Sequence, residues 1–256
     1  MIRSHHLRKG LSFLLGLGAV ASIEASVAAP VHAFPWGELI FRGIELLQLS
    51  TISPQQRIEL GADIHQQIAS NYEFNTNSQL NAYVDRIGQQ LAAASDCSEY
   101  PFRFFVIQDP SINAFTTTGG FVYVNTGLID AADNQAQLAG VLAHEIGHIC
   151  NDDLIDRLQQ TAVAQGAASL TGLDRSTLVS LGYQIAVDLP WSRRAELAAD
   201  VSALEYVTRA GYDPYALPNF LSKLLNAPSP PAFFSSHPAP EVRIEALEEQ
   251  LAGAPL

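Results

Sequence analysis

The segment of residues 141–150, VLAHEIGHIC, places two histidines and a glutamate inside a run that is otherwise typical of a buried helix. Because an α-helix turns about 100° per residue, His144 and His148 lie one turn apart on one face, and both imidazoles can reach the same cation. Glu145 follows the first histidine directly, where its carboxylate can deprotonate a water molecule held by that cation. A chance HExxH match in a core helix is the alternative, so the metal site requires a third ligand.

A second helical pattern, which begins at Ser192 and stops at Gly211, offers that ligand. Glu196 and Asp200 lie one turn apart on one face of it, beside alanines that are small enough to let another helix approach closely. A catalytic zinc commonly takes two histidines and one carboxylate, so we predict that Glu196 is the third ligand. Asp200 is then placed to accept the second N–H of a ligand histidine and to fix its tautomer. A solvated acidic helix face is the alternative, which the upstream HExxH disfavours.

The first 33 residues differ in character from the rest of the chain. Three basic residues precede an apolar stretch at residues 11–21, and small residues offer a cleavage site at Ala33. This pattern predicts a secretory signal peptide over residues 1–33 and an exported protein, in the periplasm or outside the cell. An uncleaved membrane anchor is the alternative.

The acidic composition limits the partners that the chain can bind. The chain carries 14 Lys and Arg against 26 Asp and Glu, and without residues 1–33 the net charge is −14, because that segment holds three basic residues and one acidic residue. Nucleic acid is therefore excluded as a partner. Export also permits a disulfide, and the only two cysteines, Cys97 and Cys150, form one possible pair. Two buried free thiols are the alternative.

The remaining sequence, residues 34–256, has the pattern of a single mainly helical domain with short strands. Ser53, Pro54 and Gln56 combine an N-cap, a proline at the first helical position and a capping-box glutamine. The expected elements are an N-terminal helix within 34–52 and, in a catalytic core over 53–247, a helix to about residue 70, a helix at 78–94, strands at 102–107 and 121–124, and the metal helix from residue 133 or 134.

Four motifs follow one another along the core. They are INAFTTTGGFVYVNTGLI at 112–129, HEIGH at 144–148, ELAAD at 196–200 and FFSSHPAPEVRI at 233–244. In this order they resemble the gluzincin metallopeptidases of the HtpX and CAAX prenyl endopeptidase family. The likeness covers residues 53–247 and is closest to the soluble, exported, BepA-like branch.

The resemblance implies an α+β fold, a mainly helical zincin catalytic domain with a small antiparallel or mixed sheet packed on the HExxH helix. It also implies one Zn²⁺ per chain, bound by His144, His148 and Glu196, with Glu145 as general base. The chain departs from its relatives at residues 150–153, CNDD, where an Arg-His pair is common. That change puts in doubt any substrate or regulatory role of this corner, but not the metal site.

His237, in the proline-rich segment SSHPAP, is the further catalytic candidate. We predict that it donates a hydrogen bond to the oxyanion that forms when a peptide bond is attacked. It could instead occupy the open position on the zinc and keep the enzyme latent, or be an exposed loop residue. The effect of His237→Ala on turnover distinguishes these roles.

We expect substrate to bind through its backbone. The strand after Gly119 and Gly120, which starts with Phe121 and Val122, is predicted to lie at a sheet edge beside the zinc and to pair with an extended peptide. Such recognition favours unfolded or misfolded polypeptides. Asn113 either hydrogen-bonds substrate or holds its own loop.

These observations predict an exported zinc metalloendopeptidase that cleaves unfolded or misfolded proteins in envelope quality control. The alternative is a metal-containing chaperone or assembly factor that holds clients at the same strand without cleavage, and Glu145 argues against it because holding needs no base. The apolar segment 34–49, from Phe34 to Leu49, could contact a membrane surface or an outer-membrane partner, although a helix that covers the core is the simpler interpretation.

Overall fold

The computed structural model describes residues 52–164, 166, 170 and 173–253. The predicted signal peptide at 1–33 and the predicted helix at 34–49 lie outside the described residues, and the proposed membrane contact of that helix lies outside them too. None of the described helices is long and apolar enough to cross a membrane.

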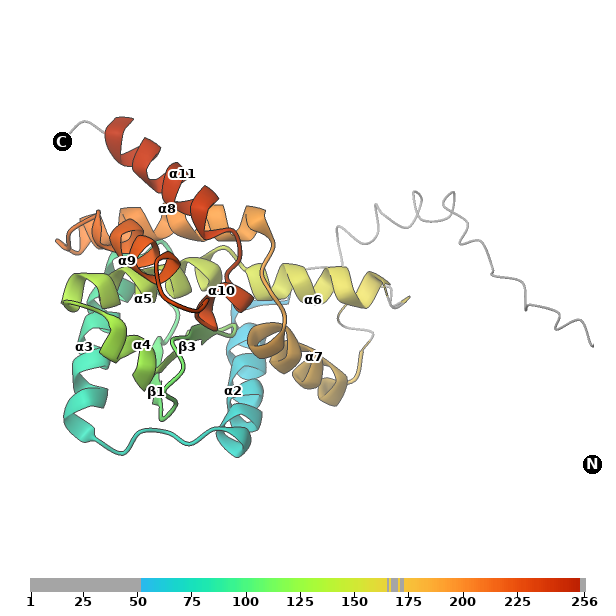
Figure 1. Ribbon diagram of the computed structural model, residues 1–256. Coiled ribbons are helices and arrows are strands. Elements are labelled where there is room, and N and C mark those ends of the chain that lie inside the picture. The colour runs from blue at the N-terminus through green and yellow to red at the C-terminus, as the bar shows by residue number, and fades with distance from the viewer. Residues whose placement is uncertain (1–51, 165, 167–169, 171–172, 254–256) are drawn as a thin grey trace, which may run out of the picture.

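The predicted α+β fold with a small mixed sheet is confirmed (Figure 1). The described strands are β1 Arg103–Ile107, β2 Ala114–Thr116 and β3 Phe121–Asn125. The described helices are α2 Pro54–Asn71, α3 Ser78–Ala94, α4 Thr126–Ala131, α5 Gln135–Cys150, α6 Asp153–Ala164, α7 Arg175–Asp188, α8 Arg193–Arg209, α9 Ala216–Leu225, α10 Phe233–Ser236 and α11 Pro240–Gly253.

Local signals place several helix ends where the sequence predicts them. The capping box of α2 is present, since Ser53 Oγ accepts a hydrogen bond from Gln56 N and Gln56 Oε1 accepts one from Ser53 N. The side chain of Asn134 caps α5, and that of Ser192 caps α8. The metal helix therefore begins within two residues of the predicted position.

The sheet has the strand order β1-β3-β2, with β1 parallel and β2 antiparallel to β3. The prediction that the strand after Gly119 and Gly120 forms a sheet edge is therefore wrong, because β3 is the central strand and is buried over its whole length. The two glycines serve the tight turn from β2 to β3, where their φ angles are +72° and +98°. A Cβ atom on Gly119 would lie 2.5 Å from the Cα atom of Ile58, so this turn also packs against α2.

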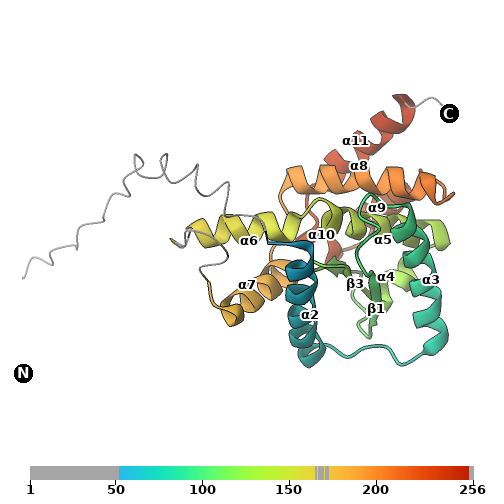
Figure 2. The same cartoon turned by 180° about the vertical axis from the view of Figure 1, so that it is seen from behind.

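Side chains on the two faces of the sheet enter two different cores, as strand alternation requires. Val122 and Val124 face the cluster that contains α3 and α5, whereas Phe121 and Tyr123 face the cluster beneath α2, α6 and α7. Accordingly α2 and α3 lie on opposite sides of the sheet (Figure 2).

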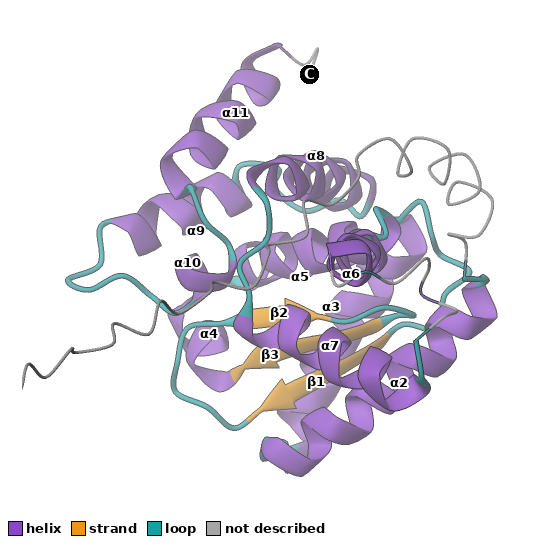
Figure 3. Cartoon of the chain, turned by 90° about the vertical axis from the view of Figure 1, so that its right-hand side faces the viewer, coloured by secondary structure: helices purple, strands orange, loops and turns teal. Residues whose placement is uncertain are grey.

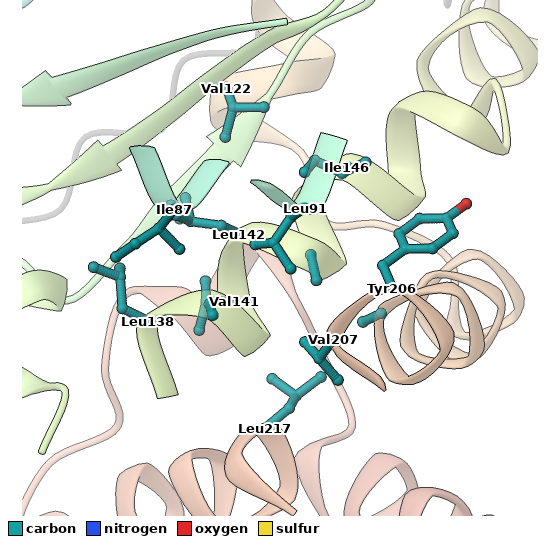
Figure 4. Packing of buried hydrophobic residues seen from close by; sticks show 14 of the residues in the cluster. Ile87, Leu91, Val122, Leu138, Val141, Leu142, Ile146, Tyr206, Val207 and Leu217 are labelled. Atoms are coloured by element: carbon teal, nitrogen blue, oxygen red, sulfur yellow. The ribbon is translucent and has the colours of Figure 1, made fainter. Parts of the chain in front are cut away.

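Helix α5 lies between the sheet and α8 (Figure 3). It is buried all round from Gln137 to Ile149, and its apolar side chains pack against α3, α8 and α9 (Figure 4). A Cβ atom on Gly147 would lie 2.9 Å from the carbonyl oxygen of Ala199, so α5 and α8 approach as closely as their backbones allow. Cys150, the last residue of α5, forms a disulfide with Cys97 in the loop after α3.

Candidate metal centre

Four donor side chains converge between α5, α8 and the segment after α10. The Nε2 atoms of His144 and His148 are 3.1 Å apart, and Glu196 Oε1 lies 3.4 Å from the Nε2 atom of His148. His237 adds Nδ1, 3.3 Å from His144 Nε2 and 3.2 Å from Glu196 Oε1. All four residues are fully buried, and their donor atoms lie within 4.8 Å of one another.

These separations suit a tetrahedral ion. Ligands held 2.0–2.1 Å from a tetrahedral zinc lie about 3.3 Å from one another. The four side chains therefore form a donor set of the right size and chemistry for such a cation, with His144, His148 and Glu196 as predicted and His237 as the fourth member.

Each of the two histidines on α5 presents its second ring nitrogen to a carboxylate. His144 Nδ1 lies 2.9 Å from Asp200 Oδ1, the partner that the sequence predicts for a ligand histidine. His148 Nδ1 lies 2.7 Å from Asp153 Oδ2, a partner that the sequence analysis missed. Both contacts leave Nε2 free to face the donor cluster. The only sequence signal for Asp153 is its place just beyond the end of the metal helix.

Glu145 lies beside the donor set but outside it. Both of its carboxylate oxygens are buried, and neither has a hydrogen-bond partner among the described residues. Burial raises the pKa of Glu145 above its usual value. Because buried carboxylate oxygens without hydrogen bonds are costly, this arrangement fits a site that holds a cation and a polar reactant in front of Glu145.

A comparison of sequences places this site in a known family. The sequence model of peptidase family M48 matches residues 78–251, which include every one of these donors and Glu145. The chain belongs to peptidase family M48. The resemblance inferred from the four motifs is thereby confirmed at the level of the family.

Curated relatives in this family share about three residues in ten with the chain. The beta-barrel assembly-enhancing protease of Escherichia coli (strain K12) is 29% identical over 219 residues, which cover 76% of this chain and 44% of the relative. The protein of the same name from Yersinia pestis is 28% identical over 216 residues, 76% of this chain and 44% of the relative. The mitochondrial metalloendopeptidase OMA1 of Schizosaccharomyces pombe is 31% identical over 183 residues, 67% of this chain and 53% of the relative. The chain thus spans about half the length of these relatives.

His144 and His148 differ in the charge state that their surroundings favour. Burial and the nearby Arg243 lower the pKa of His144 to about 3, so this ring is neutral and ready to bind a cation. Burial disfavours the charged form of His148 as well, but the hydrogen bonds with Asp153 and Glu196 outweigh it and raise its pKa to about 10. In the metal-free site the surroundings therefore favour the neutral form of His144 and the protonated form of His148.

His237 is not an exposed loop residue, since its side chain is fully buried. Besides its place among the donors, its Nε2 lies 3.3 Å from the carbonyl oxygen of Ala114 and 3.4 Å from Glu145 Oε1. The preceding residue, Ser236, accepts a hydrogen bond from Trp191 N through its carbonyl oxygen. This hydrogen bond holds the segment that carries His237, and His237 itself lies where a fourth ligand would lie.

The residues predicted to bind substrate lie in two different settings. Gly119, Gly120, Phe121 and Val122 belong to the central strand and the turn before it, where backbone groups already pair with β1 and β2. Asn113 accepts a hydrogen bond from Ser236 Oγ at 3.3 Å, which ties the start of β2 to α10.

Arg243, on α11, is the buried cation that neutralises the carboxylates of this site. Its Nε and Nη2 atoms donate to both oxygens of Asp200 at 2.7 and 2.6 Å, and its Nη1 lies 2.7 Å from Glu196 Oε2. These contacts fix α11 against α8.

We expect Arg243→Ala to lower the free energy of unfolding of the metal-free protein by about 3–5 kcal/mol, because it leaves two buried carboxylates without their cation. Urea unfolding followed by circular dichroism measures the change. Arg209→Ala is the matched control, since Arg209 also pairs with two carboxylates, Asp96 and Glu205, but on the exposed surface. Equal losses in the two variants would show that burial of the Arg243 cluster contributes nothing.

Proposed function

We propose that this M48 domain is an exported zinc endopeptidase that hydrolyses peptide bonds of unfolded or misfolded proteins in the periplasm. The observation that carries the proposal is the buried His-His-Glu donor set with the Glu145 carboxylate beside it, whose oxygens accept no hydrogen bond from the described residues. The family and the printed names of its relatives, which are proteases and metalloendopeptidases, support the same reaction. The disulfide is consistent with an exported protein.

The chemistry of the site divides between the metal and Glu145. A zinc ion held by His144, His148 and Glu196 would supply a Lewis acid that lowers the pKa of water and polarises the scissile carbonyl. Glu145, whose pKa is raised by burial, takes the proton of the attacking water and then delivers it to the nitrogen of the leaving amine. Arg243 and Asp200 hold Glu196 and His144 in place during both steps.

We propose the outer edge of β2 as the place where an extended substrate pairs, in place of the central strand first expected. In the ladder with β3, Asn113 accepts from Asn125 N, so the alternating residues Ala114 and Thr116 direct their main-chain groups away from β3. The carbonyl oxygen of Ala114 reaches His237 Nε2 instead of another strand. A peptide added along this edge would pass beside the donor cluster, and it would be recognised mainly through hydrogen bonds to its main chain.

We also propose that the conformation in which His237 lies among the metal donors is an inactive, closed form of the enzyme. His237 completes a four-donor set, and a zinc with four protein ligands has no position left for water. Ala114 and Thr116 are buried as well, so the segment that carries His237 must move before substrate can reach either the metal or the strand edge. His237 could then act as the predicted oxyanion donor only after its segment has moved away from the metal position.

The competing function is a chaperone that holds unfolded clients without cutting them. Its clients would leave intact, whereas those of an endopeptidase leave as fragments. Glu145 favours cleavage, because a buried carboxylate without hydrogen bonds is destabilising and holding would not need it.

The test is casein cleavage by the purified chain and by its His237→Ala variant, so that a closed site cannot hide the activity. We expect fragments whose formation stops when a chelator such as 1,10-phenanthroline removes the metal, and which return on addition of about one equivalent of zinc, as one site per chain requires. Magnesium serves as the control ion, because it prefers oxygen ligands. If both proteins bind zinc and neither produces fragments, the chaperone takes the place of the endopeptidase.

A further inference from the structure

We infer that Asp153 is a positioning residue that orients the ligand His148, and that the turn following the metal helix is built to present it. The inference rests on the proposed function, since His148 must bind a metal for its orientation to matter. It concerns the corner at residues 150–153, where α5 ends and α6 begins.

The contact between Asp153 and His148 determines how the imidazole ring lies. The distance from Asp153 Oδ2 to His148 Nδ1 is 2.7 Å, and Trp191 stacks on the ring with 4.8 Å between centroids and 21° between planes. A hydrogen bond at one edge and an aromatic surface on one face restrict rotation of the ring. They direct Nε2 toward Glu196 and His144.

The turn that carries Asp153 is held on both sides. Asp152, the preceding residue, adopts the left-handed conformation with φ +59°, which is uncommon for a residue with a side chain and is adopted more readily by Asp than by most others. Its carboxylate accepts hydrogen bonds from Arg57 Nη1 on α2 at 2.5 and 2.6 Å. Two residues earlier, Cys150 is joined to Cys97. A turn with an uncommon backbone angle persists where such contacts hold it. This turn places the Asp153 carboxylate against His148.

Asp153 differs from Asp200, the carboxylate that serves the other histidine. Asp200 shares its charge with Arg243, which donates two hydrogen bonds to it. Among the described ion pairs, the partner of Asp153 is His148 itself. Asp153 shares its carboxylate with no Lys or Arg among the described ion pairs, so its loss should weaken metal binding through His148.

A general preference of carboxylates for helix N-termini does not account for this contact. Asp156 lies in the first turn of α6 with Asp153, and both line a polar cavity of about 320 Å³ together with Trp191 and Arg194. Both gain from the helix dipole. Of these two, only Asp153 hydrogen-bonds a member of the donor set, so Asp156, although more exposed, controls for the helix end and the cavity that they share.

The experiment compares the wild-type chain with Asp153→Ala, Asp153→Asn and Asp156→Ala. Three quantities are measured: the dissociation constant for zinc by competition with a chromophoric chelator, the urea midpoint of the metal-free protein, and the visible spectrum of the cobalt-substituted protein. We expect Asp153→Ala to weaken zinc binding about 10- to 100-fold. Asp153→Asn keeps an acceptor oxygen but no charge and should lose less, and Asp156→Ala should bind zinc like the wild type.

The cobalt spectrum separates positioning from stability. We expect the two Asp153 variants to shift the cobalt bands, which depend on ligand geometry, and the Asp156 variant to leave them unchanged, whatever the urea midpoints do. If the wild type binds zinc and Asp153→Ala binds it equally well with an unchanged cobalt spectrum, the inference is overturned and the proposed function stands. If the wild type binds no zinc at all, the proposed function falls, and the inference with it.

Discussion

Glu145→Gln is expected to abolish cleavage while the protein keeps its metal. The amide cannot take a proton from water, and removal of a general base of this kind costs roughly 10²- to 10⁴-fold in rate. Glu145 is not among the four donors, so zinc should bind as in the wild type or more tightly. The measurement is kcat/KM for casein, or for a fluorogenic peptide derived from it, with the zinc content determined on the same samples.

Glu196→Gln provides the matched comparison. Both carboxylates are fully buried, both changes preserve shape, and the two side chains face the same cluster. We expect the Glu196 variant to lose metal affinity together with activity, since it changes a ligand. A Glu145→Gln protein that cuts at the wild-type rate would remove the base from the mechanism, and one that loses zinc would make Glu145 a ligand.

His237→Ala is expected to raise kcat/KM on the order of tenfold or more. If the closed arrangement holds most molecules, the apparent activity is reduced by the fraction that is open, and deletion of the blocking side chain removes that reduction. The geometry supports this direction, because His237 Nδ1 lies within 3.3 Å of both His144 Nε2 and Glu196 Oε1. Zinc affinity should fall slightly, because one of four donors is lost.

Ser235→Ala is the control for this variant, since Ser235 is an exposed neighbour in the same segment and contributes no donor. It should leave kcat/KM unchanged. Lost turnover in His237→Ala would instead support the oxyanion role first predicted for this histidine. Unchanged turnover would assign it neither role.

The parts of the site that sequence predicts are those encoded by a local pattern. The spacing of His144 and His148 needs only the helical repeat, and the ends of α5 and α8 follow from side chains that cap them, Asn134 and Ser192. Glu196 and Asp200 could be predicted because one face of a helix carries both, next to residues small enough for close packing.

The parts that sequence does not predict depend on contacts between distant segments. The glycine pair at 119 and 120 indicates a turn, but no local pattern predicts whether the strand after it lies in the middle or at the edge of the sheet. β2 has only three residues, too few to show alternation. Asp153 was missed because its role requires the turn after α5 to fold back, and that turn is held by Arg57, 95 residues away in sequence.

The close contact of Gly147 with Ala199 links metal binding to the folding of the protein. Two donors lie on α5 and the third on α8, so a cation finds its full ligand set only after these helices have packed. An isolated peptide that copies α5 would hold zinc weakly, since it offers two ligands instead of three. Zinc content should therefore follow the native fraction of a sample, and the metal-free protein should unfold and be degraded more readily than the zinc-bound protein.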